Sequence, residues 1–308
     1  MNKEVKDTAI IGAGPAGLTA ALYTCRYNLD ILIFGKEPGG MGVYAPLVEN
    51  YPGVIGLSGI ELMKRFQKQV EKQGVEIIEK EIVDIKLEQN YFALKSKEDE
   101  FKAKTIVLAT GSKKRKLQVK GEKEFVSKGV HYCAVCDAAL YQNKKVMVVG
   151  GGDSAFRAAE MLLSQDNEVY LIDIAKKFFA TPHLIKEVKK NKKAHLIQKN
   201  SITEIRGEKA VEKVILGKPY QGEKELAVEG IFVEIGMAPR NKLAKKLGLA
   251  LNKKGEIIVD DLNQTDMRGV FAAGDITNIM GTKQIVTAAA QGAVAATSVY
   301  KYLTAKNK

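Results

Sequence analysis

Two glycine-rich segments constrain the fold of this 308-residue chain more than any other feature. Residues 12–17 read Gly-Ala-Gly-Pro-Ala-Gly, and residues 150–155 read Gly-Gly-Gly-Asp-Ser-Ala. Each segment follows an apolar, β-prone run, at residues 8–11 and 146–149, and precedes a helical pattern that leads to a further apolar strand. A strand, a tight turn and a helix in this order open a βαβ unit of a parallel sheet. The sequence therefore predicts an α/β protein with two doubly wound units.

A glycine loop between a strand and a helix is suited to hold the pyrophosphate of a dinucleotide. The first glycine makes the turn, the second lets the backbone approach the phosphates, and the third lets the helix pack against the strand. One such loop is a weak signal, whereas two copies in the required context are a stronger one. An acidic residue about 20 positions further on would hold a ribose hydroxyl. The first unit has Gly35 at this place, and the second has Asp173.

A late strand indicates how the two units are connected. Residues 269–273 form a further apolar run that leads into Gly274-Asp275, and a long helix is expected at residues 285–303. Because this strand returns after the second glycine loop, the second unit is expected to be inserted into the first. The predicted domains are residues 1–113 together with 245–308, and the inserted residues 114–244. Other expected elements are a helix at residues 60–73 and strands at residues 31–34, 75–78, 82–87, 91–94, 105–109, 169–172, 230–235 and 256–259.

The composition narrows the class of protein. The net charge is +12, but the lysines are spread along the chain and no aromatic and basic platform accompanies them, so nucleic-acid binding is not expected. A solvated surface or the docking of an acidic protein partner are the two interpretations left open. No apolar run reaches the roughly 18 residues that a membrane span needs. The charged first residues lack a secretory apolar segment, so we expect a cytoplasmic protein that does not bind membranes.

Cys133 and Cys136 form a C-x-x-C pair that Asp137 follows directly. The pair stands at the start of a predicted helix, and the partial positive charge of a helix N-terminus lowers the pKa of a thiol. Two thiols at this spacing can close a disulfide, and the neighbouring carboxyl can donate or accept a proton. A zinc site needs about four ligands, and only His131 is near in sequence. A redox pair is therefore favoured over a metal site or inert thiols, Cys25 is expected in the core, and the histidines are expected to be ordinary polar residues.

The motifs of this sequence, taken in their order along the chain, resemble those of the low-molecular-weight thioredoxin reductases, and the resemblance covers nearly the whole chain. The C-x-x-C-D element placed just before the second glycine loop is the most specific part of the resemblance. The full set is Gly12-x-Gly14-Pro15-Ala16-Gly17, Gly39-Gly40, Glu49-Asn50-Tyr51-Pro52-Gly53, Ala109-Thr110-Gly111, Cys133-x-x-Cys136-Asp137, Gly150-Gly151-Gly152 and Ala273-Gly274-Asp275. The resemblance implies two dinucleotide-binding domains, with FAD in the first and a pyridine nucleotide in the second, and a homodimer.

The resemblance also implies the residues of each site. Cys136 would face the flavin, Cys133 would attack the disulfide of a thioredoxin-like protein, and Asp137 would be the acid or base. The residues implied for FAD are Gly12, Gly14, Pro15, Ala16, Gly35, Gly40, Met41, Asn50, Val83, Ala109, Gly111, Gly274, Asp275, Lys283, Gln284 and Ile285. Those implied for the pyridine nucleotide are Gly150, Gly152, Asp153, Ser154, Ala155 and Asp173.

The implied activity is the reduction of a thioredoxin-like protein. A donor reduces the flavin, the flavin reduces the disulfide, and the dithiol reduces the partner by thiol–disulfide exchange. The family reads the 2′-phosphate of NADPH with a His-Arg-Arg cluster and one more Arg, where this chain has Asp173-Ile174-Ala175 and Phe179. An anion there would repel the phosphate, so NADH is expected as the donor rather than NADPH.

Alternatives to this reading concern the donor and the activity itself. Lys176 and Lys177 could rescue NADPH binding. A ferredoxin- or deazaflavin-linked thioredoxin reductase with a degenerate nucleotide site is a second alternative, since the basic surface would suit an acidic ferredoxin. A flavoprotein for electron transfer or redox sensing is the third.

Overall fold

The computed structural model describes residues 4–45, 47–279 and 282–305, and the chain folds as two compact units. The first unit comprises Met1–Lys113 and Ala238–Lys308, and the second comprises Lys114–Met237. The inserted unit therefore ends seven residues before the predicted limit of 244. The reason is α6 (Lys242–Leu247), whose Leu243, Ala244 and Leu247 pack into the core of the first unit.

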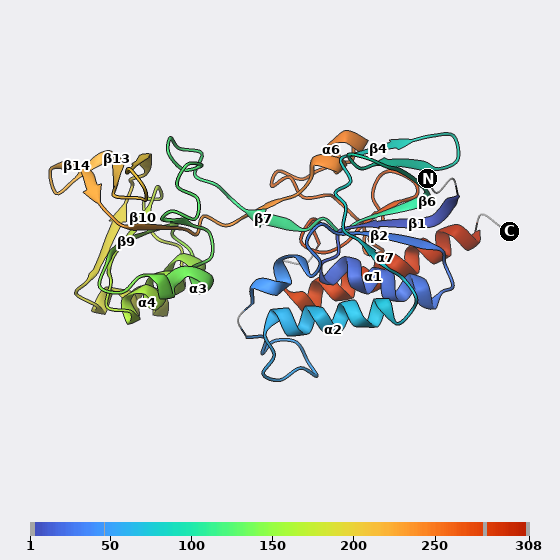
Figure 1. Ribbon diagram of the computed structural model, residues 1–308, viewed down its shortest axis with the longest axis horizontal. Coiled ribbons are helices and arrows are strands. Elements are labelled where there is room, and N and C mark those ends of the chain that lie inside the picture. The colour runs from blue at the N-terminus through green and yellow to red at the C-terminus, as the bar shows by residue number, and fades with distance from the viewer. Residues whose placement is uncertain (1–3, 46, 280–281, 306–308) are drawn as a thin grey trace. The chain divides into compact units, whose positions relative to one another are not determined.

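The first unit is built on a seven-stranded sheet in the order β3-β2-β1-β6-β5-β4, with β17 also paired to β6 (Figure 1). The strands are β1 (Val5–Ile11), β2 (Ile31–Phe34), β3 (Ile77–Ile78), β4 (Asp84–Leu87), β5 (Phe92–Lys95), β6 (Glu100–Leu108) and β17 (Val270–Ala272). The beginning of β6 pairs antiparallel with β5, and its end pairs parallel with β17. Because β1, β6 and β17 are parallel, their carboxyl ends bring Gly12, Ala109 and Ala273 to one edge of the sheet.

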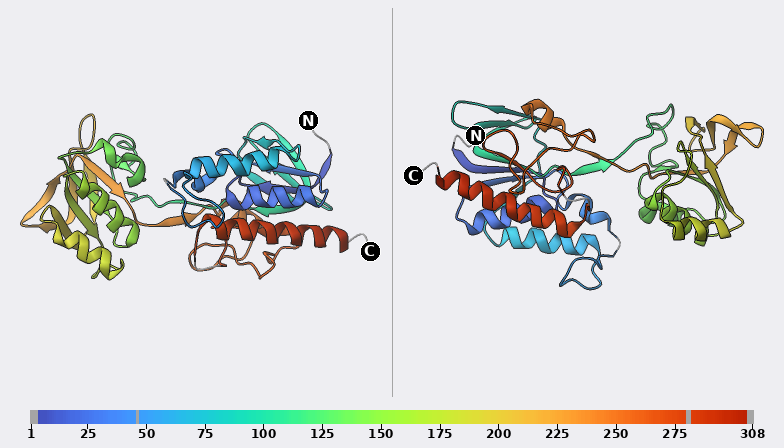
Figure 2. Two further views of the ribbon diagram at one scale, coloured as in Figure 1. Left: turned by 90° about the horizontal axis from the view of Figure 1, so that it is seen from below. Right: turned by 180° about the vertical axis from the view of Figure 1, so that it is seen from behind.

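Three helices cover one face of this sheet (Figures 1 and 2). They are α1 (Pro15–Arg26), α2 (Gly59–Glu71) and α7 (Ile285–Ala305), and a 3-10 helix, η1 (Gly40–Tyr44), precedes α2. Alternate strand residues point to opposite faces, so Ile10 and Val107 pack among the helices, whereas Ala9 and Ile106 pack with α6 and the β4–β5 hairpin. The structure confirms that the apolar runs of the sequence mark the buried strands of a doubly wound unit.

The second unit has a five-stranded parallel sheet in the order β11-β10-β9-β15-β8, with a three-stranded antiparallel sheet, β12-β13-β14, beside it. The strands are β8 (Val130–His131), β9 (Lys145–Val149), β10 (Glu168–Asp173), β11 (Ala194–Gln198), β12 (Ile202–Arg206), β13 (Lys213–Tyr220), β14 (Glu223–Ala227) and β15 (Gly230–Val233). Its helices are α3 (Ala134–Asp137), the 3-10 helix η2 (Ala138–Leu140), α4 (Asp153–Ser164) and α5 (Pro182–Lys190). Val146 and Val148 pack against α4, whereas Met147 and Val149 pack against the antiparallel sheet. The expected βαβ start of this unit is thus present.

Two features differ from the sequence expectations. Residues 256–259 are not a strand, because Ile257 makes only isolated bridges, to Leu251 and Thr277. The segment from α5 to β14 carries elements that the apolar pattern did not predict.

The chain passes between the units twice, through β7 (Ser112–Lys114) and β16 (Met237–Pro239), which pair as a two-stranded sheet. Among the residues that the structure describes, no helix is both long and apolar enough to cross a membrane.

Candidate functional site

A cavity of about 450 Å³ lies in the first unit, where β1, β6 and β17 end. One side is the first glycine loop and the start of α1. Gly12 has φ +114°, and a Cβ there would lie 2.1 Å from the carbonyl oxygen of Ala109, so only glycine makes this turn without a clash. Gly14 precedes α1 with φ −81°, and no side chain of the described residues caps the first turn. The free N–H groups and positive end of α1 therefore meet the cavity without a competing carboxylate.

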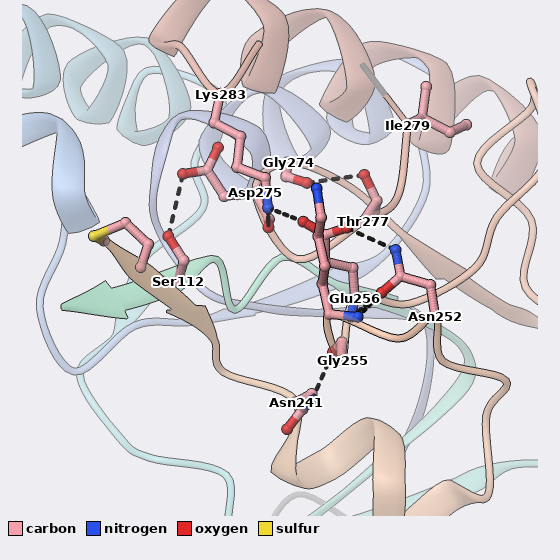
Figure 3. A network of polar contacts seen from close by, with 12 residues as sticks. Ser112, Asn241, Asn252, Gly255, Glu256, Gly274, Asp275, Thr277, Ile279 and Lys283 are labelled. Carbon is pink, nitrogen blue, oxygen red and sulfur yellow. Dashed lines mark hydrogen bonds and ion pairs between the residues drawn. The ribbon is translucent and has the colours of Figure 1, made fainter. Parts of the chain in front are cut away.

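Asp275 and Lys283 supply charge elsewhere in the cavity. Burial raises the pKa of Asp275, while Lys283 and the Ser112 hydroxyl, which donates to Asp275 at 3.3 Å, act in the opposite direction. The Lys283 ammonium donates to the carbonyl oxygen of Asp275 at 2.8 Å and forms an ion pair with Glu256 (Figure 3). Glu256 is buried and accepts a hydrogen bond from Asn252 at 2.7 Å. The network fixes the ammonium next to Asp275, on the cavity wall.

The cavity suits FAD in shape and chemistry. A glycine loop at a helix N-terminus suits a pyrophosphate, and a buried carboxylate suits hydroxyl donors. The apolar side chains of Met41 and Ile285 offer surface for an aromatic ring system. The residues present therefore fit the dinucleotide that the first glycine loop indicates.

In the second unit, Cys133 and Cys136 form a disulfide, with their Cα atoms 5.3 Å apart. Cys133 precedes α3, and its sulfur accepts a hydrogen bond from the backbone N–H of Cys136 at 3.3 Å. Cys136 is exposed, Cys133 is half-buried, and exposed Val135 lies between them. The predicted helix is present but only four residues long, so its dipole contributes less than a longer helix would. The disulfide therefore lies at the surface of the second unit rather than in its core.

The second glycine loop has a turn of the same kind but different surroundings. Gly152 precedes α4, and the first residue of that helix is acidic Asp153, which accepts from the backbone N–H of Thr181 at 2.7 Å. The Asp173 carboxylate lies directly over the loop, since a Cβ on Gly151 would be 2.8 Å from its Oδ2. Two carboxylates thus flank the helix start.

The Phe179 ring also covers this loop. Its backbone N–H donates to the Gly151 carbonyl at 2.9 Å, and a Cβ on Gly152 would be 2.8 Å from the ring. The ring is 72% exposed, so it forms part of the loop's outer surface rather than of the core.

Comparison with known proteins decides the family. The model of the pyridine nucleotide-disulphide oxidoreductases matches residues 6–292. The chain belongs to this family. It is 38% identical over 312 residues to the thioredoxin reductase of Peptoclostridium acidaminophilum, covering 98% of each chain, and 37% identical to that of Bacillus subtilis, covering 98% and 96%. The solved Lactococcus lactis thioredoxin reductase (FR conformation) is 36% identical, with a TM-score of 0.85 and 97% and 99% coverage.

Within the pyridine nucleotide-disulphide oxidoreductases, the chain groups with the low-molecular-weight thioredoxin reductases. The resemblance seen in the sequence is therefore confirmed. The chain is accordingly a FAD-dependent oxidoreductase.

Nearly all residues expected at the first site of this oxidoreductase line the cavity. They are Gly12, Gly14, Pro15, Ala16, Gly35, Gly40, Met41, Asn50, Ala109, Gly111, Gly274, Asp275, Lys283, Gln284 and Ile285. Val83 is the exception and does not line it. It precedes the edge strand β4, where its N–H donates to the Lys95 carbonyl and its carbonyl accepts from Lys246. Of the residues expected at the second loop, Gly150 and Gly152 lie in the β9–α4 turn, Asp153, Ser154 and Ala155 form the first turn of α4, and Asp173 ends β10.

Sequence reasoning missed several residues around the sites. Glu37 and Arg240 line the cavity, with charged groups 4.0 Å apart. Glu37 stands two residues after Gly35, so a wider search for the ribose-binding acid could have found it. Glu256 gave no signal, because it meets Lys283 only in the folded chain. His131 was expected to be an ordinary polar residue, but it contacts Asp137.

Replacing Gly14 by alanine should weaken FAD binding without harming the fold. The backbone there is ordinary for any residue, and the nearest atom to an added Cβ is 3.9 Å away. The methyl group would stand at the cavity end of α1. Loss of one hydrogen bond to a charged group costs about 1.5–3 kcal/mol, so Kd for FAD should rise at least about tenfold. Flavin fluorescence titration of the apoprotein measures this.

Gly12→Ala is the contrasting variant, because its Cβ would clash with Ala109 and its φ is strained. It should lower the thermal stability of the apoprotein, whereas Gly14→Ala should not. Unchanged FAD affinity in a folded Gly14→Ala protein would contradict the placement of the pyrophosphate.

Replacing Glu256 by glutamine should destabilise the protein in a pH-dependent way. Burial would raise the pKa of Glu256, but Lys283 and Asn252 bring it below the ordinary value of 4.5. A carboxylate with a lowered pKa stabilises the fold above pH about 4.5, and this contribution is lost as the pH falls through the lowered pKa. We expect Glu256→Gln to lower the free energy of unfolding by about 1 kcal/mol at pH 7 and by less as the pH approaches 4. Urea denaturation at the two pH values measures this difference. Glu98→Gln, at a side chain that is 81% exposed, should have almost no effect at either pH. Equal losses at both pH values would show that the ion pair is not the cause.

Proposed function

We propose that the chain is a thioredoxin-disulfide reductase. FAD, held in the cavity of the first unit, would supply two electrons at a time to the Cys133–Cys136 disulfide. The observation that carries the proposal is this disulfide, with exposed Cys136 and adjacent Asp137, in a chain whose relatives are named thioredoxin reductases.

Each residue of the pair has a separate role in the proposal. Cys136 receives the electrons, which breaks the disulfide, and two protons complete the dithiol. The Cys133 thiolate then attacks a disulfide of a thioredoxin-like protein, and Cys136 resolves the mixed disulfide. Asp137 takes up and returns protons as the thiols exchange. The exchange regenerates the Cys133–Cys136 disulfide and leaves the partner as a dithiol.

The residues of the cavity would hold FAD along its length. The first turn of α1, with Gly12 and Gly14, would bind the pyrophosphate through backbone N–H groups. Asp275 would accept from ribityl hydroxyls, and the segment from Lys283 to Ile285 would lie beside the isoalloxazine ring. These assignments rest on the cavity lining and on the family.

We propose NADH as the electron donor in preference to NADPH. The position of Asp173 over the second glycine loop supports this, because its carboxylate can accept from a ribose diol and repels a 2′-phosphate. The alternative donors are a reduced ferredoxin or a deazaflavin, which would leave the second loop without a role in electron supply. Lys176 and Lys177 are exposed at the same turn and are the groups that could favour NADPH.

Two rival activities make different predictions. A ferredoxin–NADP reductase would not need the cysteine pair, so replacing both cysteines by serine would leave its activity intact. A flavoprotein for electron transfer or redox sensing would bind FAD without reducing a protein disulfide. Cytoplasmic location and a homodimer stay predictions, and light scattering of the purified protein tests the dimer.

One anaerobic experiment tests the proposal. The oxidised enzyme is mixed with NADH, NADPH or reduced ferredoxin, and flavin bleaching is followed before oxidised thioredoxin is added. We expect fastest bleaching with NADH and release of thioredoxin thiols by the wild type but not by the Cys133→Ser/Cys136→Ser protein. Thiol release by the double variant would reject the proposed activity, and faster bleaching by NADPH would reject the proposed donor.

A further inference from the structure

His131 lies close to the redox pair but is removed from solvent. It ends β8, only two residues before Cys133, and is 7% exposed. Pairing of β8 with β15 sets it opposite Phe232, and the two rings stack with centroids 5.1 Å apart at 22°. The ring is therefore held in one orientation by the sheet and by its neighbour.

Both nitrogens of the His131 ring have partners. Nδ1 is 2.9 Å from Oδ2 of Asp137, and Nε2 is 2.8 Å from the hydroxyl of Tyr141. Tyr141 is itself fixed, because its ring fills the space that a side chain at position 230 would need. A Cβ on Gly230 would lie 2.4 Å from that ring. The three side chains form a chain of contacts from the core to Asp137, whose side chain is 32% exposed.

The hydrogen-bond chemistry fixes the direction of this chain. An ionised carboxylate only accepts, so Nδ1 of His131 carries the proton that is donated to Asp137. The neutral ring then accepts at Nε2, and the Tyr141 hydroxyl donates to it. Burial, together with the charges of Asp137 and Glu229, raises the pKa of Tyr141 to about 12, which keeps this donor protonated. One oxygen of Asp137 is thereby engaged by His131, and the other is left for proton exchange.

We infer that His131 is a positioning residue for disulfide exchange: it holds the Asp137 carboxylate in the orientation that moves protons between the thiols. This inference rests on the proposed function. In the step, the Cys133 thiolate, whose proton has gone to solvent, attacks the partner disulfide. Ionised Asp137 takes the proton of the Cys136 thiol and passes it to the partner's leaving thiolate. The Cys136 thiolate then displaces the partner's second sulfur from Cys133, and that sulfur takes a proton from solvent. Two electrons pass to the partner, the protons balance, and Asp137 ends ionised as it began.

A matched pair of substitutions tests the contact to Asp137. His131→Asn places an amide nitrogen where Nδ1 was and keeps the donor to Asp137. His131→Gln places its amide near the position of Nε2, so it reaches Tyr141 and not Asp137. Both variants lose the ring that stacks on Phe232, which makes each the packing control of the other.

The measurement uses the holoenzyme reduced anaerobically with dithionite, which removes any dependence on the physiological donor. Reduced enzyme is mixed with oxidised bacterial thioredoxin, or with 5,5′-dithiobis(2-nitrobenzoate), whose aromatic thiolate leaves readily without a proton. With thioredoxin, the Gln variant should be roughly tenfold slower than wild type, and the Asn variant within about threefold, as expected for loss of one hydrogen bond. With the aromatic disulfide, both variants should match the wild type.

The outcomes separate this inference from the proposed function. Equal rates for the Asn and Gln variants with thioredoxin, or a Gln variant that is equally slow with both disulfides, would overturn the role of His131 while leaving the reductase activity in place. Reduced wild type that releases thiols from neither disulfide would refute the proposed function, and the inference with it.

Discussion

Replacing Cys136 by serine should lower the turnover of a thioredoxin disulfide at least about 10⁴-fold, as expected when one member of a catalytic unit is removed. This sulfur is the proposed acceptor of electrons from FAD, and a serine hydroxyl cannot form the disulfide. FAD content should stay unchanged, because Cys136 belongs to the second unit and the cavity is built by the first. A coupled assay with oxidised thioredoxin, read against the flavin absorbance, measures both quantities.

Cys25→Ser is the matched control for this prediction. Cys25 is the free cysteine of the described chain, half-buried on α1, and burial raises the pKa of its thiol. A protonated thiol is a poor nucleophile, so this variant should retain wild-type turnover. Substantial turnover by the Cys136→Ser protein would mean that electrons leave the flavin by another route.

The wild-type enzyme should prefer NADH over NADPH by about 30-fold or more in kcat/KM, because the charge of Asp173 repels the 2′-phosphate of NADPH. Two like charges about 5 Å apart in a medium of effective dielectric constant near 20 repel by roughly 3 kcal/mol, and the exposure of the loop reduces this to about 2 kcal/mol. Asp173→Asn removes the charge and keeps the side-chain volume. It should raise kcat/KM for NADPH about tenfold and lower that for NADH, since the ribose loses an acceptor. Steady-state rates with both nucleotides measure the preference.

Asp166→Asn provides the control for net charge. Asp166 lies in the same unit and pairs with Lys193, away from the glycine loop. The Asp166→Asn variant should have the same ratio of kcat/KM for NADH to kcat/KM for NADPH as the wild type. A wild-type preference for NADPH would contradict the assignment of Asp173, and bleaching by reduced ferredoxin alone would transfer the donor role to a protein.

The central strands of both units could be predicted because their residues are apolar on both faces. The runs that became β1, β2, β9 and β10 are short and rich in β-branched residues, and the first three of them end at a glycine, which is typical of buried parallel strands. The antiparallel β12–β14 sheet was missed because few of its residues are buried, namely Ile202 and Ile205 in β12 and Val214 and Leu216 in β13. The end of the inserted unit was placed too late because Leu243 and Leu247 form a short helix whose packing partners are remote in sequence.

The residues of the candidate sites also fall into those that a local motif predicts and those that meet only in the folded chain. Gly12, Gly14, Cys133 and Cys136 are local motifs, and their spacing carries the chemistry, so the sequence was sufficient to find them. Contacts between residues that are far apart in the sequence could not be predicted from local motifs. Lys283 meets Glu256 only after the chain folds around β17 and α7. His131 meets Tyr141 because β8 pairs with β15 and because position 230 is glycine. No local pattern records either of these contacts.

An anaerobic dithionite titration of the purified holoenzyme tests whether the Cys133–Cys136 disulfide exchanges electrons with FAD. We expect each wild-type chain to take up four electrons, two for the flavin and two for the disulfide. The Cys133→Ser/Cys136→Ser protein should take up two, and alkylation should label both thiols of the reduced wild type. Wild-type uptake of only two electrons, with Cys133 and Cys136 still resistant to alkylation when the flavin is fully bleached, would contradict the account.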